Sequence, residues 1–314
     1  MTVYIARRFL GLIPVLAIIA VIAFFILRVA PGDPTAMLLP QDASAEDIDR
    51  LRERLGLNRP LPIQFFEWFG SLVTGDFGIS FHSRSPVLET IAQRVTPTIW
   101  LAVSAQLFAI LVAIPGGIIA AIRQNSWWDK GVTLFALGGV AIPNFWFGML
   151  LVMLVSINLR WLPSQGFVDP FDDPINGIRR LILPTITLGY AQAAQIMRMT
   201  RSSMLDVMRL DYVRTARAKG LQERTTLFRH ALINAMNPII TVIGFSVASL
   251  LSGAIVVELV FNYPGIGQLV VEAVGRRDFP LIQGVLVLLA AMTLVVNFFV
   301  DVSYSIFDPR IRYE

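Results

Sequence analysis

The chain has 314 residues, of which 55% are hydrophobic and only 15% are charged. Soluble domains carry about 25% charged residues, so this composition predicts a membrane protein. The absence of cysteine excludes structural disulfides, thiolate catalysis and cysteine metal sites. No nucleic-acid-binding motif accompanies the net charge of +4, so we expect a lipid bilayer and no nucleic acid as a partner.

Long stretches without Asp, Glu, Lys, Arg or His organise the chain. About 20 apolar residues cross a bilayer, and six stretches reach or approach that length. They are residues 9–27, 95–122, 131–159, 181–197, 231–257 and 279–300. We therefore predict an all-α membrane protein built as a bundle of six transmembrane helices. Prolines inside most of these stretches, such as Pro143, predict kinks that neighbouring helices can accommodate.

Three regions follow from this pattern. Residues 1–30 form the first span, which we expect to be retained because no small-residue cleavage site follows it. Residues 31–94 form an outer loop with amphipathic helices. Ser44 is placed to cap a first amphipathic helix, which is expected to end before Gly56. An aromatic segment around Trp68 is expected to form a second helix. Residues 95–314 form a five-span core with a cytoplasmic loop at 198–230.

Basic residues in the short loops predict the orientation. With the N-terminus inside, the inner segments hold fourteen Lys and Arg residues, whereas the short outer loops hold five, at Arg160, Arg179, Arg180, Arg276 and Arg277. Positive loops stay in the cytoplasm, so both termini are expected there. The six stretches together with this count of basic residues predict a multi-pass membrane protein with a cytoplasmic N-terminus and C-terminus.

The inner loop between the fourth and fifth stretches is basic and structured. Apolar steps of three and four residues predict a helix through Tyr212, and Gly220 is placed to stop it in the left-handed conformation. A second apolar stripe is expected to begin at the turn, with Leu221, Thr225, Phe228 and Leu232. The loop is thus predicted to be a helix-turn-helix connected at both ends to membrane spans.

Residues 212–220, followed by Arg229-His-Ala-Leu232 and Asn234, resemble the cytoplasmic signature loop of binding-protein-dependent ABC importers. The resemblance is to the peptide and nickel permease branch, although Arg214 replaces the usual glutamate and Ile233 the usual late proline. In that family the loop is a coupling helix that docks into the ATPase subunit. The resemblance therefore implies a coupling role for Asp211, Tyr212, Arg214, Thr215, Ala216, Arg217, Ala218, Lys219, Gly220 and Leu221.

Further stretches extend the resemblance over essentially the whole chain: residues 31–34, 75–80, 261–267, 277–280 and 308–312. It implies the six-span bundle of a type I ABC importer in the bacterial inner membrane. The implied cargo is di- or oligopeptides or glutathione, with a nickel importer as the alternative. The implied partners are two ATP-binding subunits, a second homologous permease and a periplasmic solute-binding protein.

The sequence contains no recognisable catalytic, nucleotide-binding or metal-binding motif. A phosphate-binding Gly-x-x-x-x-Gly-Lys-Ser/Thr loop is absent, and His82 and His230 fall in different loops without metal-ligand spacing. We therefore expect no catalytic residue, metal site or cofactor in this chain, which disfavours a membrane-embedded enzyme. ATP hydrolysis is expected on separate subunits.

Uncharged polar residues inside the spans are candidates for a translocation path. We select Gln192 and Gln195, on the span that leads into the loop, together with Asn144 and Ser246. The alternative is ordinary hydrogen bonding between helices, which is modest in bilayers. A secondary carrier driven by protons or sodium would need ionisable groups within the membrane, and Glu258 and Asp301 are expected to lie where water or headgroups solvate them.

Overall fold

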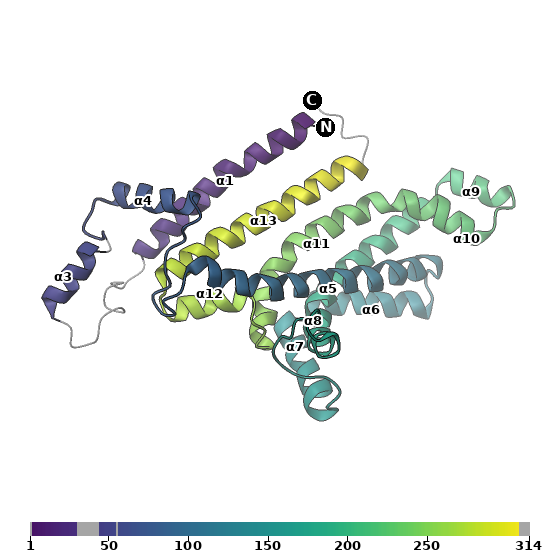
Figure 1. Ribbon diagram of the computed structural model, residues 1–314. Helices are drawn as coiled ribbons and strands as arrows, with labels where there is room; N and C mark the ends of the chain where they lie inside the picture. Colours follow the sequence, from purple (N-terminus) through teal and green to yellow (C-terminus); the bar gives the residue numbers. More distant parts are fainter. Residues whose placement is uncertain (1, 30–43, 55, 308–314) are drawn as a thin grey trace. The chain divides into compact units, whose positions relative to one another are not determined.

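The computed structural model describes residues 2–29, 44–54 and 56–307, and the regular elements in this part of the chain are helices (Figure 1). The chain divides into two compact units. One contains Met1–Thr96 and Gly265–Val295, and the other contains Pro97–Pro264 and Val296–Glu314. The long helix α5 (Val87–Ile122) begins in the first unit and continues into the second.

The first unit includes α1 (Thr2–Val29), α3 (Ala45–Arg54), α4 (Leu61–Val73), α12 (Ile266–Gly275) and most of α13 (Phe279–Phe307). Its core packs Val87 and Ile91 of α5 against Ile266, Leu269 and Val285. The predicted cap is confirmed, since the Asp47 N–H donates to the Ser44 hydroxyl at 3.2 Å. The predicted aromatic helix is α4, and its Phe65 ring meets Phe24 of α1 edge to face with centroids 5.3 Å apart.

The second unit surrounds α8 (Pro174–Met208), which packs against α6 (Trp127–Ala141), α7 (Asn144–Leu151) and α11 (Ile233–Val260). Glycine lets α5 and α8 approach closely. A Cβ atom on Gly189 would lie 2.8 Å from the carbonyl oxygen of Ala105, and one on Gly117 would lie 2.8 Å from that of Met197. Small residues at such contacts are typical of helix packing in membranes.

Four described segments are long and apolar enough to cross a membrane: Ile5–Phe25, Val87–Ile122, Glu223–Val260 and Phe279–Val302. They contain most or all of the first, second, fifth and sixth predicted stretches. The fourth stretch lies within α8, which is less apolar because it carries Thr and Gln side chains and basic residues towards its end. Much of that stretch is buried inside the second unit.

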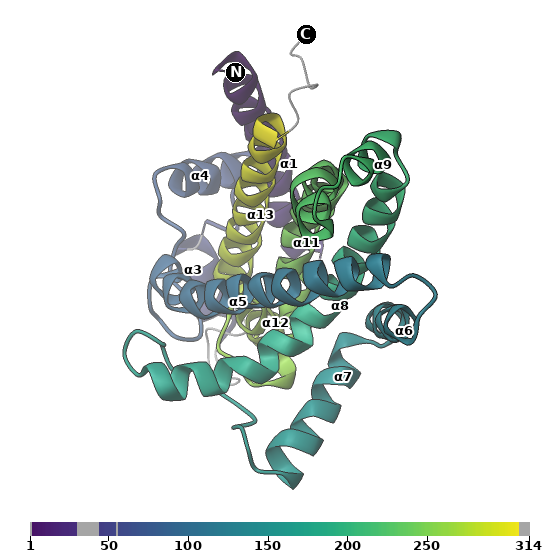
Figure 2. The same cartoon turned by 90° about the vertical axis from the view of Figure 1, so that its right-hand side faces the viewer.

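The stretch at 131–159 is long and apolar enough to span as predicted, but it forms a bent pair of helices and not one straight helix. The chain bends by 110° between α6 and the helix formed by α7 and the π-helix η1 (Val152–Asn158). Figure 2 shows the change of direction, with α6 viewed almost along its axis and α7 running across the view. The cause is local: Ile142 is extended because it precedes Pro143, and the proline ring cannot continue the helical hydrogen bonding.

Candidate coupling and translocation sites

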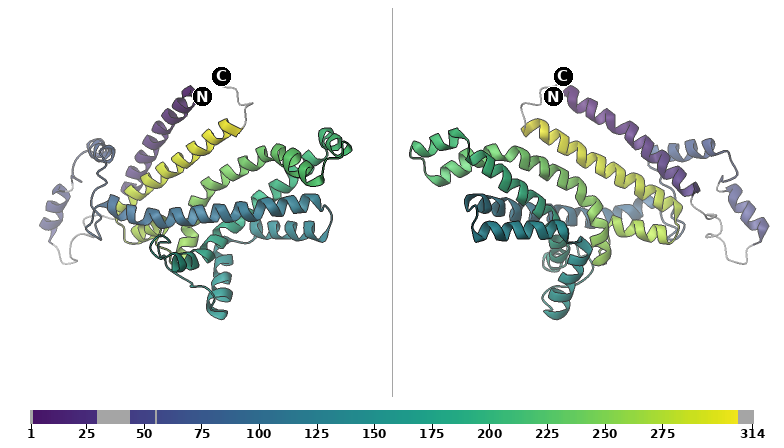
Figure 3. Two further views of the ribbon diagram at one scale, coloured as in Figure 1. Left: turned by 45° about the vertical axis from the view of Figure 1, so that its right-hand side comes forward. Right: turned by 180° about the vertical axis from the view of Figure 1, so that it is seen from behind.

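The predicted coupling loop is a short helix ended by glycine. After α8, the chain forms α9 (Asp211–Ala218), turns, and enters α10 (Glu223–Thr225) and the π-helix η2 (Thr226–Leu232). Gly220 has a φ of +77°, the Gly220 N–H donates to Arg217 O, and the Leu221 N–H donates to Ala216 O. This pair of bonds is a Schellman motif, so the predicted left-handed stop is confirmed. Figure 1 and both views in Figure 3 show α9 and α10 beyond the ends of α8 and α11.

Contacts within the loop hold α9 in place. Val213 and Ala216 are buried on its inner face. Arg217 pairs with Glu223 across the turn, at 3.1 Å from Nε and 2.7 Å from Nη2, and the Tyr212 hydroxyl donates to His230 O. The remaining predicted coupling residues are exposed: Asp211, Tyr212, Arg214, Thr215, Arg217, Ala218, Lys219, Gly220 and Leu221. Ala216 therefore supports α9 from within, while Ala218 and Gly220 face outward.

The second apolar stripe does not follow the predicted phase. Leu221 is 40% exposed and Phe228 is 50% exposed, whereas Leu227, Ala231 and Ala235 are buried. Leu221 belongs to the turn, so it does not set the phase of the helix that starts at Glu223. The correction places the apolar side chains of Leu221 and Phe228 on the outer surface of the loop.

A chain of polar side chains links α5, α8 and α11 inside the second unit. The Gln192 amide donates to the Ser249 hydroxyl at 2.9 Å, the Ser249 hydroxyl donates to Ser246 O, and the Ser246 hydroxyl donates to Gln106 Oε1 at 3.0 Å. Gln106 Nε2 and Gln192 Oε1 are buried without a hydrogen-bond partner. This row of polar side chains thus has one amide donor, on Gln106, and one carbonyl acceptor, on Gln192, that make no hydrogen bond.

The structure brings together two of the four predicted path residues. Gln192 and Ser246 are both buried and belong to this polar chain. Gln195 is exposed, and Asn144 is partly buried at the start of α7. In the described part of the chain, neither side chain shares a hydrogen bond with the polar chain.

Two buried carboxylates of the second unit were not recognised from the sequence as structural groups. Asp129 at the start of α6 accepts two hydrogen bonds from Arg201 of α8. Glu258 near the end of α11 is fully buried and accepts a 2.7 Å hydrogen bond from the Thr98 hydroxyl. The expectation that water or headgroups solvate Glu258 is therefore wrong, because the fold covers it. Among the described residues, no group of three or more His, Asp or Glu side chains is placed to hold a metal ion.

Comparisons with known proteins agree on one family. Residues 113–313 match the binding-protein-dependent transport system inner membrane component, and residues 1–102 match the N-terminal region described for such components. The probable peptide ABC transporter permease y4tP of Sinorhizobium fredii is 43% identical over 313 residues, which covers 100% of both chains. The glutathione transport system permease GsiC of Escherichia coli is 42% identical over 311 residues, 99% of each chain.

A solved structure supports the fold. A chain of the inward-facing MetNI methionine ABC transporter matches with a TM-score of 0.58 at 15% identity, covering 70% of this chain and 97% of that chain. At this identity the match concerns the fold alone, which is that of a type I ABC importer permease. With two family matches and relatives similar over the full length, this chain belongs to the inner membrane components of binding-protein-dependent transport systems.

Proposed function

We propose that this chain is a permease subunit of an ABC importer that carries peptides, with small peptides such as glutathione among its cargo. The observation that carries the proposal is the similarity, 42–43% identity over 99–100% of the chain, to permeases named for peptide and glutathione transport. Residues 31–94 and the five-span core at 95–314 would then serve as outer loop and translocation region.

The energy for import comes from partner subunits in this proposal. The chain has no phosphate-binding loop of its own. The exposed turn at Ala218 and Gly220, flanked by Leu221 and Phe228, is a compact surface that suits docking into a cleft of an ATPase. Two ATP-binding subunits, a second related permease and a periplasmic solute-binding protein would complete the importer.

The orientation is proposed from the basic-residue bias, with both termini in the cytoplasm. Because the chain has no cysteine, single cysteines can be introduced without background. Ser44 and Ser202 are both exposed. A membrane-impermeant maleimide should label Ser44→Cys in intact spheroplasts, and Ser202→Cys only after permeabilisation. The reverse pattern would place the termini outside.

Reconstituted vesicles test the proposed energy source. The full complex should accumulate peptide with ATP even when a protonophore and a sodium ionophore collapse both gradients. A complex whose ATPase subunits carry a substitution in the hydrolytic site is the control and should show no uptake. Concentration of peptide by this chain alone, driven by an imposed ion gradient, would refute the proposal and favour a secondary carrier.

A further inference from the structure

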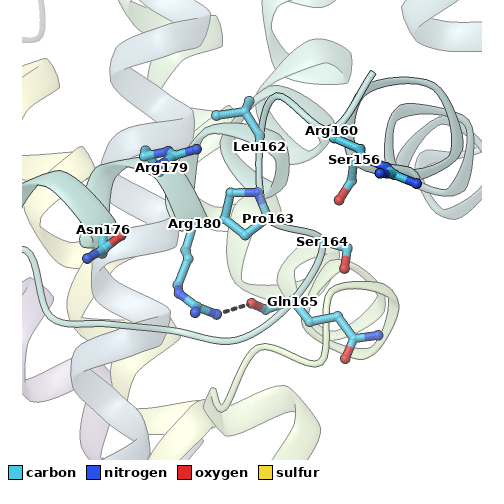
Figure 4. A pocket seen from close by; sticks show the side chains of 9 residues that line it. All are labelled: Ser156, Arg160, Leu162, Pro163, Ser164, Gln165, Asn176, Arg179 and Arg180. Carbon is cyan, nitrogen blue, oxygen red and sulfur yellow. Dashed lines mark hydrogen bonds between the residues drawn. The ribbon is translucent and has the colours of Figure 1, made fainter. Parts of the chain in front are cut away.

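An open, polar pocket of about 520 Å³ lies in the second unit, between the end of η1 and the start of α8. Arg160, Arg179 and Arg180 line it together with the polar side chains of Ser156, Ser164 and Asn176 (Figure 4). This volume falls within the range of about 300–1,000 Å³ that is usual for small-molecule sites. The pocket belongs to the loop that the orientation proposed above places outside the membrane.

The pocket has positive charge that no ion pair among the described residues neutralises. No Asp or Glu lines it, and none of its three arginines forms an ion pair with a described residue. Arg179 donates to Trp161 O at 3.2 Å and Arg180 donates to Gln165 O at 2.5 Å, as the dashed line in Figure 4 marks for Arg180. A guanidinium has five N–H donors, so these bonds orient the groups and leave donors for a ligand.

Two of the three acidic residues on the same loop, Asp169 and Asp173, already accept hydrogen bonds, and the third, Asp172, is exposed and does not line the pocket. Asp173 caps α8 by accepting from the Asn176 N–H and side chain, and these hydrogen bonds hold the pKa of Asp173 below its usual range. Asp169 accepts from the Phe171 N–H. Asp173 thus stabilises the start of α8 and Asp169 the turn before it, and neither lines the pocket.

The loop that carries the pocket is held close to α8 by two glycines. Gly166 has a φ of +84°, and a Cβ atom there would lie 2.9 Å from Arg180 Nη1. The Gly166 N–H also donates to Phe261 O, which ties the loop to the end of α11. At Gly177 of α8, a Cβ atom would lie 2.8 Å from Cα of Pro170. These contacts preorganise the pocket before any ligand arrives.

We propose that this pocket binds the carboxylate of an anionic peptide on the outer side of the permease. This inference rests on the proposed import of peptides. Arginine is suited to the task because its planar fork donates two parallel hydrogen bonds to a carboxylate. The hydroxyls of Ser156 and Ser164 and the amide of Asn176 can bond peptide groups nearby, so the site matches a short peptide with a free carboxylate.

The test measures equilibrium binding without ATP, on the full complex in lipid nanodiscs. The probes are glutathione and trialanine, each compared with the same peptide carrying esterified carboxylates. Arg160→Gln is the sharpest variant because Arg160 makes no hydrogen bond to the rest of the described chain. Arg276→Gln is the matched control, an exposed arginine of another outer loop. Equal membrane yield and melting midpoint establish that each variant is folded.

Arg160→Gln should weaken binding of at least one free peptide about tenfold, because one charge-assisted hydrogen-bonding group is lost. Esterified peptides should bind weakly and equally to wild type and variant, and Arg276→Gln should behave as wild type. Raising the salt concentration should weaken binding of the free peptide more in the wild type than in Arg160→Gln, which keeps two of the three arginines, because charges in an open site are screened.

Three outcomes overturn the inference. They are absence of carboxylate-dependent binding in the wild type, unchanged affinity in Arg160→Gln, and weakened docking of the solute-binding protein with unchanged peptide affinity. The last outcome would assign the arginines to an acidic protein surface. ATP-driven uptake measured on the same complexes keeps the two proposals apart. If uptake persists with any of these outcomes, peptide binding at the pocket is refuted and the proposed import function stands.

Discussion

Arg201 of α8 binds Asp129 in the first turn of α6 through two hydrogen bonds, 2.5 Å from Nε to Oδ1 and 2.9 Å from Nη2 to Oδ2. Asp129 is buried and also accepts from the Asn125 N–H at 2.9 Å, so its charge is fully engaged. The pair fixes the start of α6 to α8, the helix that leads into α9. It therefore links α6 to the helix that leads into the predicted coupling loop.

Asp129→Ala should lower the free energy of unfolding by about 2 kcal/mol, less than the 3–5 kcal/mol of a fully buried pair, because the Arg201 side chain is 29% exposed. Arg201→Lys, with Asp129 in place, should cost less than Asp129→Ala, since lysine keeps the charge but not the planar fork. Thermal melting of the purified complex measures both. Arg198→Ala, at an exposed position of the same helix, is the control, and an equal loss there would mean that the pair has no special role.

Gly220→Leu should leave the chain in the membrane but abolish coupled transport. Leucine resists the left-handed conformation at φ +77°, and its side chain would enlarge a surface that is otherwise open around this glycine. Gly220→Asn should retain more activity, because asparagine tolerates this conformation better. ATP-driven peptide uptake and peptide-stimulated ATP hydrolysis, both at equal protein level, are the readouts.

Gly131→Leu is the control for added bulk, because Gly131 lies in helix α6 with open space around it and an ordinary φ. If Gly220→Leu takes up peptide at the wild-type rate, the turn at Gly220 is not part of the surface that contacts the ATPase.

Local sequence patterns predicted where the helices lie, but they did not predict which helices contact one another. The six uncharged stretches lie in helices, and the glycine stop of α9 formed as expected because both depend on neighbouring residues. The bend before Pro143 had a local signal, but a kink and a 110° break have the same sequence signature. The burial of Glu258 and the pairing of Arg201 with Asp129 had none, since each requires helices distant in sequence to meet.

Thr98→Val should lower the melting midpoint, because Glu258 would lose its 2.7 Å donor in a fully buried setting. Losing a hydrogen bond to a buried polar group costs about 1–3 kcal/mol. Thr96→Val, at an exposed position of the same helix, should have little effect. Equal shifts for the two variants would contradict a structural role for this bond.

Glu258→Gln separates that structural role from proton coupling. The amide oxygen of glutamine can still accept from Thr98, but the side chain can no longer exchange a proton at working pH. ATP-driven uptake should persist in this variant, since we assign the energy to ATP. Loss of uptake in a complex that melts like the wild type would instead indicate that Glu258 carries a proton during transport.

The Gln192 side chain can serve either helix packing or the predicted translocation path. Its amide bonds the Ser249 hydroxyl at 2.9 Å, and its buried Oε1 has no partner. Ser249→Ala removes the shared bond and leaves the amide in place, whereas Gln192→Leu removes both. If the amide contacts passing peptide, Gln192→Leu should reduce uptake several-fold more than Ser249→Ala, with similar melting midpoints. If the two variants lose stability and uptake in parallel, the residue serves packing alone, where a hydrogen bond in a membrane contributes about 0.6 kcal/mol.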